Sequence, residues 1–503
     1  MVTALTEDSD MIRLRKERKL PYWQLAADIL QLGFDRYKAF EEGKERNGFA
    51  TDRHFYAMLC NNLGIALSRL GRDDLAWPIH ESGFNASPFH ENAINTAYSA
   101  LYSHNPSGAA RGNALLQQFV QKHKRFLGMD DMQRAAALDL GCFGLACQSV
   151  DEWLAKRETF HQEWGWMRQQ SRFCNSDEHY LPNDWSFIRD QHNYAINDEW
   201  RALQYLHSRF PDDPRVLNLM LRNRRDHAAS DARREGLALA SEVERVLAPR
   251  RHTAEGAQHW FESRYSLAYL RYRSWFYDAD LVGQEFLPQA HQEFKAIFPE
   301  YETLRNDPNH IDAMLDYSMM LVREDLDLDG GIVWLGRVID ALEPQPRAPA
   351  QRSAWDPKTA ADPALALAYV FRAHAYCMQD QNDKARADLL EAGALNPWMP
   401  AVWYWMATIE SESGNVRAAI DMANRFVGYD GSNPPDDEER AIMLDVLIRM
   451  HHMEGENDQA QARLEALETL DPDYEELPEL QALFHPSKQS GKSVWSTVKG
   501  WFR

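Results

Sequence analysis

Apolar residues recur with helical periodicity along the whole chain. Alternation of the β-strand kind is nearly absent, whereas Ala, Leu, Arg and Glu, which favour helices, are abundant. Turn signals such as LGRDD, NPSG, FPDDP and LNPWMP interrupt the helical stretches at short intervals. The pattern therefore predicts an all-α chain of antiparallel helical hairpins joined by short turns.

A 34-residue repeat is clearest in residues 366–429. Aromatic and small residues of its first copy return in its second: Tyr369, Ala373 and Ala385 return as Trp403, Ala407 and Ala419. The pattern appears again in 441–471, and a separate copy, NNLGIALSRLGRDDLAWPIHESGFNASP, lies at 61–88. We therefore predict helical hairpins at 57–90, 366–396, 400–430 and 441–471.

Small residues mark the places where the two helices of a hairpin should approach each other. They occur in pairs separated by the same interval: Gly64 and Ala76, Ala373 and Ala385, Ala407 and Ala419. We expect the members of each pair to face each other, because two helix axes come close only where both side chains are small. A proline that ends the second helix follows at the same further interval in three copies: Pro88, Pro397 and Pro472.

These positions together resemble the tetratricopeptide repeat (TPR) family, whose unit is a 34-residue helix–turn–helix. The resemblance implies an all-α, right-handed solenoid of antiparallel hairpins. Weaker copies keep only a second-helix residue and the proline, as in Ala202 with Pro214 and Ile332 with Pro344. Residues 101–200 and 217–300 depart from the repeat spacing but still have the pattern of helical hairpins.

The repeat pattern and the loop signals divide the chain into six segments. They are 1–100 with N-terminal helices and one TPR-like hairpin, 101–300 with irregular, aromatic-rich hairpins, 301–345 with a degenerate hairpin, 346–363 as a Pro-rich loop, 364–484 with the C-terminal repeats, and 485–503 as a linker and basic amphipathic tail. The tail sequence VWSTVKGWFR places Trp495 and Trp501 on one helical face. It can cap the last repeat, dock on a partner or contact a membrane surface.

Charge and cysteine content narrow the class of protein. The formal net charge of -21 disfavours nucleic acid as a partner, since phosphate binding relies on Lys and Arg. The five cysteines are widely spaced and form no CxxC, which fits thiols in a reducing compartment. The N-terminus lacks the apolar run of a secretory signal, and no stretch has the length of a transmembrane helix. We therefore expect a cytoplasmic protein.

Residues that resemble metal sites or catalytic motifs do not complete one. Asp325, Asp327 and Asp329 spell D-x-D-x-D-G, but the twelfth position of a calcium loop, which needs Glu, is Gly336. A group of His, Cys and Asp residues between His161 and His192 lacks compact zinc-ligand spacing. No phosphate-binding glycine loop or nucleophile elbow occurs, so we expect no cofactor, no metal and no enzyme activity, although a triad of distant residues stays open.

The TPR resemblance implies that the first helix of each repeat lines a groove that binds a peptide. The residues it nominates for partner binding, together with the two tail tryptophans, are Asn61, Asn62, Arg69, His374, Tyr404, Thr408, Arg449, Trp495 and Trp501. Asn62 matches an Asn that in many family members binds the peptide backbone, because an amide both donates and accepts. The family's clamp of two Lys and two Asn for a C-terminal carboxylate is not visible.

The sequence thus favours an interaction scaffold or adaptor whose partner is another protein or a peptide. The alternative is a regulatory or sensor module that binds a small ligand or peptide in the aromatic-rich central region. Five tryptophans lie within residues 153–200 of that region: Trp153, Trp164, Trp166, Trp185 and Trp200. Aromatic residues at helical spacing are usually core, but some of these can line a groove.

Overall fold

The computed structural model describes residues 9–41, 53–88, 90–174, 186–227, 230–298, 308–343, 363–396, 399–429, 435 and 437–484. Every regular element in these ranges is a helix, and none of their residues forms a strand. The chain divides into two compact units, which we call unit 1 (Met1–Arg168 with Asp190–Ile297) and unit 2 (Gln169–Arg189 with Phe298–Arg503).

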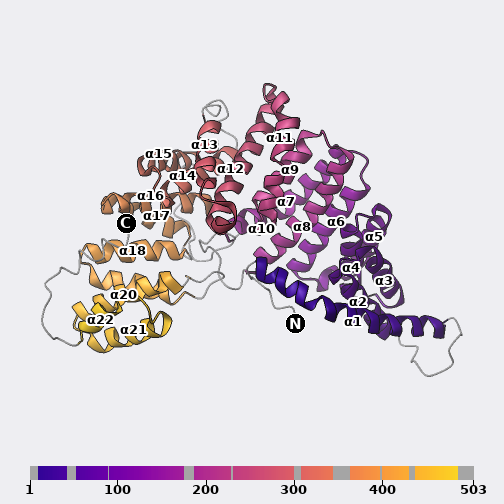
Figure 1. The fold of residues 1–503 in the computed structure, drawn as a ribbon, viewed down its shortest axis with the longest axis horizontal. Coiled ribbons are helices and arrows are strands. Elements are labelled where there is room, and N and C mark those ends of the chain that lie inside the picture. The colour runs from indigo at the N-terminus through magenta and orange to yellow at the C-terminus, as the bar shows by residue number, and fades with distance from the viewer. Residues whose placement is uncertain are drawn as a thin grey trace. The chain divides into compact units, whose positions relative to one another are not determined.

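Unit 1 begins with long helices arranged as hairpins (Figure 1). Its α-helices are α1 (Ser9–Glu41), α2 (Arg53–Arg69), α3 (Asp73–Ala86), α4 (His90–Tyr102), α5 (Pro106–His123), α6 (Met129–Ala146), α7 (Val150–Cys174), α8 (Ser186–Arg209), α9 (Pro214–Arg225), α10 (Ser230–Ala238), α11 (Ala240–Leu247), α12 (Ala254–Val282) and α13 (Phe286–Ile297). Most residues of α7 and α8 belong to unit 1, and the end of α7 and the start of α8 are assigned to unit 2. From α2 to α6 each helix packs against the next, so the first helices α2, α4 and α6 alternate with the second helices α3 and α5.

Unit 2 repeats the same arrangement. Its helices are α14 (Pro308–Arg323), α15 (Leu328–Leu342), α16 (Pro363–Met378), α17 (Asn382–Leu395), α18 (Pro400–Glu412), α19 (Val416–Val427), α20 (Asp437–Met453), α21 (Asn457–Leu470) and the short α22 (Leu477–Ala482). The four predicted hairpins correspond to α2–α3, α16–α17, α18–α19 and α20–α21 and are confirmed. The fold is the predicted all-α, TPR-like solenoid of antiparallel hairpins.

One type of turn joins the two helices of most hairpins. A residue with positive φ follows the first helix in each case: Gly71, His104, Asp325, Asp380, Gly414 and Gly455. The amide of the next residue then donates to a carbonyl oxygen in the last turn of the first helix, as Arg72 N does to Leu67 O at 2.9 Å. This bond and the left-handed residue are the features of a Schellman helix end. The acidic segment around Asp325 is therefore the turn between α14 and α15, and Asp327 caps α15 by accepting from Gly330 N at 2.9 Å.

The small residues lie where the hairpin helices meet, with one difference from the expected pairing. Ala76, Ala385 and Ala419 have no exposed surface. At Gly64, however, the three atoms closest to an added Cβ all belong to the ring of His80, one turn beyond Ala76. Gly64 therefore makes room for a buried imidazole, and burial lowers the pKa of His80 to about 4.

Replacement of Ala385 by Leu is expected to lower the free energy of unfolding by about 1–3 kcal/mol, because Ala385 packs in a closed core with Ala373 and Leu389. Ala387→Leu is the matched control, since Ala387 lies on the exposed face of the same helix. Urea unfolding followed by circular dichroism measures both changes. Equal stability of the two variants would show that the hairpin packs differently.

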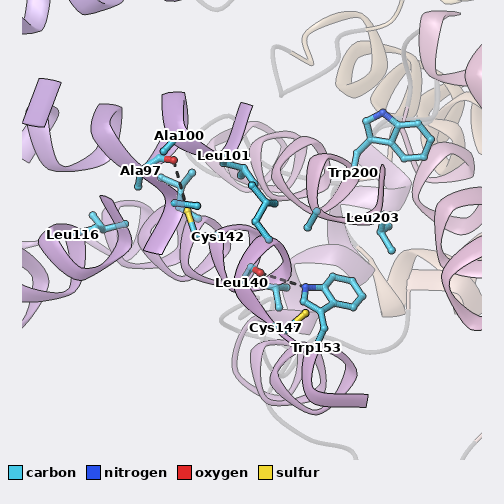
Figure 2. Close-up of a cluster of buried hydrophobic side chains, with 14 of the residues drawn as sticks. Ala97, Ala100, Leu101, Leu116, Leu140, Cys142, Cys147, Trp153, Trp200 and Leu203 are labelled. Atoms are coloured by element: carbon cyan, nitrogen blue, oxygen red, sulfur yellow. Dashed lines mark hydrogen bonds between the residues drawn. The ribbon is translucent and has the colours of Figure 1, made fainter. Parts of the chain in front are cut away.

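The core of unit 1 contains two of the central tryptophans. Trp153 is fully buried, and its Nε1–H donates to the carbonyl oxygen of Leu140 at 3.3 Å (Figure 2). Trp200 packs in the same core with Leu101 and Leu203. These aromatic residues are core, as most aromatic residues at helical spacing are. The side chains of Trp166 and Trp185 lie outside the described residues.

Candidate functional site

The first helices of unit 1 are joined to one another by side-chain hydrogen bonds. Between α2 and α4, Asn95 Nδ2 donates to Asn61 Oδ1 at 2.9 Å, and the hydroxyls of Ser68 and Ser99 are 3.0 Å apart. These bonds link equivalent helices of successive hairpins. Asn61, Ser68 and Asn95 are partly exposed, whereas Ser99 is buried. We call the surface formed by these three exposed residues, with Tyr98, Tyr102 and Arg201, the first-helix face of unit 1.

An aromatic and cationic group extends the first-helix face from α4 to α8. Tyr98 and Tyr102, one turn apart on α4, are stacked with ring centroids 4.0 Å apart and are partly exposed. The guanidinium of Arg201 on α8 lies over the ring of Tyr102, 4.7 Å from its centroid. Such a contact holds a planar cation beside an aromatic ring, and Tyr and Arg are both enriched among the residues that dominate binding energy in protein interfaces.

A buried carboxyl lies beneath this face. Asp198 on α8 is 3% exposed, and burial raises its pKa to about 7, against the opposing effect of Arg134 and Arg201. Burial also raises the pKa of Tyr102, and the charge of Asp198 adds to that increase. Near neutral pH Asp198 is therefore divided between its charged and neutral forms, which makes the field under the face depend on pH.

The predicted residues of unit 1 lie on or next to the first-helix face. Asn61 belongs to it, and Asn62 and Arg69 are exposed on the same helix, α2. The charge of Arg69 is close enough to lower the pKa of Tyr98, although burial raises that pKa overall. The structure thus places Asn61 and Arg69 near α4, and Asn62 on the exposed surface of α2.

In unit 2 the predicted residues differ in exposure. His374 stacks on Trp405 of the next first helix, with centroids 4.3 Å apart, and both are partly exposed. Burial lowers the pKa of His374 to about 4, so its imidazole is neutral at physiological pH. Tyr404 packs on Phe426 with centroids 5.3 Å apart. Thr408 is buried, and its hydroxyl donates to the carbonyl oxygen of Tyr404 at 3.1 Å.

Arg449 is buried at the end of unit 2 and binds groups of its own chain. Its Nε donates to Asp445 at 2.5 Å and its Nη1 to Glu479 of α22 at 3.0 Å. The hydroxyl of Tyr474 donates to the other Asp445 oxygen at 3.3 Å. Arg449 therefore attaches α22 to α20, and its guanidinium is not presented to a groove.

The tail residues Trp495 and Trp501 lie outside the described residues, so their prediction stays open. In the described part of the chain no group of three or more His, Cys, Asp or Glu side chains could hold a metal ion. Among the described helices, none combines the length and the apolar character that crossing a membrane requires.

Residues that the sequence analysis missed complete the first-helix face. Asn95, Tyr98, Tyr102 and Arg201 were not predicted, and neither was Asp198 beneath them. The one available signal was the 34-residue interval from Asn61 to Asn95, which continues the repeat register into α4. Arg201 had no such signal, because residues 101–200, which lead up to it, depart from the repeat spacing.

Comparisons with known proteins add likenesses at low identity. No protein-family model matches the chain, and no curated protein sequence matches it. The structure of the APC/C hetero-tetramer Cut9–Hcn1 is similar with a TM-score of 0.36 and 12% identity, over 98% of this chain and 96% of that chain. Yeast Tom70 is similar with a TM-score of 0.28 and 11% identity, over 86% and 96%. Naa15/Naa10 bound to HypK-THB has a TM-score of 0.27 and 11% identity, over 89% and 70%.

Proposed function

We propose that this chain is an interaction scaffold that binds an extended peptide segment of a partner protein along the first-helix face of unit 1. The observation that carries the proposal is the Asn61–Asn95 pair. Its single bond uses Asn61 Oδ1 and Asn95 Nδ2, which leaves the Asn61 amide N–H groups and the Asn95 amide oxygen for a ligand. A peptide backbone offers C=O and N–H groups at matching intervals.

The rest of the face supports the same kind of ligand. Tyr98 and Tyr102 offer partly exposed rings that can contact side chains of a peptide, and Arg201 with the exposed Arg69 adds positive charge. We therefore expect a peptide that combines apolar or aromatic residues with acidic ones. In unit 2, we propose that the stacked rings of His374 and Trp405 contact a peptide in the corresponding way.

The proposed role is binding rather than catalysis, in the cytoplasm. The described cysteines Cys142, Cys147 and Cys377 are free thiols, which supports a reducing compartment. The second candidate function, a small-ligand site in the aromatic-rich central region, is favoured by one cavity among α6, α7, α8 and α9.

Selection of peptides from a random display library on the full chain tests the proposal. We expect the double variant Asn61→Ala/Asn95→Ala to weaken binding of the best peptide about tenfold or more, and the single variant Tyr98→Ala to weaken it about fivefold. The reason is that each hydrogen bond or ring contact contributes on the order of 1 kcal/mol. Fluorescence anisotropy gives the dissociation constants.

The matched controls are Gln117→Ala and Gln118→Ala, which change exposed side chains of the second helix α5. They should bind the peptide like the wild type, and melting temperatures should show that all variants fold. If the α5 controls lose affinity and the first-helix variants keep it, the proposed surface is wrong.

A further inference from the structure

A cavity lies among four helices of unit 1, apart from the first-helix bonds described above. It has an open volume of about 480 Å³, including space continuous with solvent. Its lining comes from α6, α7, α8 and the end of α9: Gln133, Ala137, Leu140, Phe160, His161, Trp164, Ala195, Ile196, Glu199, Asn223 and Asp226. Apolar walls with a few polar groups are typical of small-ligand sites.

The charged groups of the lining are neutralised within the chain. Glu199 pairs with Arg157 at 2.5 Å, and Asp226 pairs with Arg225 at 3.0 Å. Asn223 Nδ2 donates to the carbonyl oxygen of Ile196 at 2.9 Å and to Glu199 at 3.1 Å. A charged ligand would therefore have to disrupt a pair or remain without a counter-charge, which favours a neutral ligand.

Two polar atoms of the lining have no partner among the described residues. One is Oε1 of Gln133, whose side chain is only 2% exposed, and the other is Nε1 of Trp164. Oε1 accepts and the indole N–H donates, so these two atoms supply one acceptor and one donor, in a lining that also contains the imidazole of His161. Buried polar groups are nearly always paired in folded proteins, so each of these two atoms requires a partner that the described residues do not supply.

We propose that this cavity binds a small neutral molecule with an amide-like group, that is, one donor and one acceptor on a flat apolar body. The amide N–H donates to Gln133 Oε1, and the amide oxygen accepts from Trp164 Nε1. The flat body packs against apolar residues of the walls, such as Phe160 and Ile196. This small-molecule site does not depend on peptide binding at the first-helix face. Either of the two proposals can therefore be wrong while the other is right.

Three probes test the site on the full chain: benzamide, nicotinamide and 2-piperidone. Isothermal titration calorimetry is expected to show binding of at least one, together with a rise in melting temperature at saturation. Methyl benzoate, which accepts but does not donate, should bind at least about fivefold more weakly than benzamide. Gln133→Leu and Trp164→Phe should each weaken the binding amide about five- to tenfold, the effect of one hydrogen bond.

The matched controls are Gln117→Leu on exposed α5 and Trp260→Phe on α12, which should keep the wild-type affinity. Gln133→Leu should also raise the melting temperature of the ligand-free protein, because it removes a buried acceptor without a protein partner. If Gln133→Leu does not fold, the affinity of Trp164→Phe for the amide is compared with that of the wild type instead. The proposal is overturned if none of the three probes binds, or if an amide binds both site variants as tightly as the wild type.

Discussion

Replacement of Arg449 by Met is expected to lower the free energy of unfolding by about 3–5 kcal/mol, the usual cost of leaving one member of a buried ion pair alone. Arg449 and Asp445 are 2% and 0% exposed, so water cannot replace the lost partner. Burial already raises the pKa of Asp445 to about 6, and loss of Arg449 would raise it further. The variant should therefore be less destabilised at pH 5 than at pH 8, because protonation removes the unpaired charge.

Two further variants make this prediction specific. The double variant Asp445→Leu/Arg449→Met should recover most of the loss, since apolar replacement of a whole buried pair is often neutral. Arg417→Met is the control, because Arg417 is 68% exposed and its pairs with Glu454 and Glu456 should contribute about 0–1 kcal/mol. Urea unfolding at both pH values measures all three. A small loss for Arg449→Met, equal to that of Arg417→Met, would mean that Arg449 does not anchor α22.

Replacement of Asp198 by Asn is expected to stabilise the protein at pH 8 by about 2–4 kcal/mol more than at pH 4. The folded-state pKa of Asp198, about 7, lies above the unfolded value near 4. Between these values the folded state binds more protons, so wild-type stability decreases as the pH rises through this window. Above pH 7 the cost of the buried charge is constant, and the neutral amide of the Asp198→Asn variant avoids it at every pH.

The control for Asp198 is Asp231→Asn, which changes an exposed carboxyl of the same unit. It should alter stability by less than about 0.5 kcal/mol at either pH. The Asp198 variant also tests the site, since the carboxyl lies beneath the first-helix face. Wild-type stability that is independent of pH between 4 and 7, with no gain for Asp198→Asn, would contradict the assigned burial.

The hairpins could be predicted from the sequence because their signals are local. Helical periodicity, the small residues and the turn residues each act within one 34-residue unit, and Gly71, Gly414 and Gly455 do occupy left-handed turn positions. The partner of Gly64 could not be predicted in the same way. The imidazole of His80 is buried by its tertiary contact with Gly64, and no position of the repeat pattern specifies a histidine there.

The site could be predicted only as far as the repeat register reaches. The repeat register placed Asn61, Asn62 and Arg69 on one helix, but it could not distinguish exposed from buried positions on later helices. Arg449 shows why. Its helical position equals that of a groove residue, yet α22 packs over it, and a capping helix after the last repeat has no signature in the register. Gln133 and Trp164 line one cavity from two different helices, α6 and α7. The aromatic-rich sequence indicated Trp164 as a possible lining residue, but no sequence pattern indicated Gln133.

Photo-crosslinking of the best displayed peptide to the full chain tests most directly whether binding occurs on the first-helix face of unit 1. Benzoylphenylalanine at positions 62 and 69, on α2, and at positions 117 and 118, on α5, samples a first and a second helix with exposed side chains. We predict that the peptide crosslinks to positions 62 and 69 and that unlabelled peptide competes for both. Crosslinks confined to positions 117 and 118 would contradict the proposed binding surface.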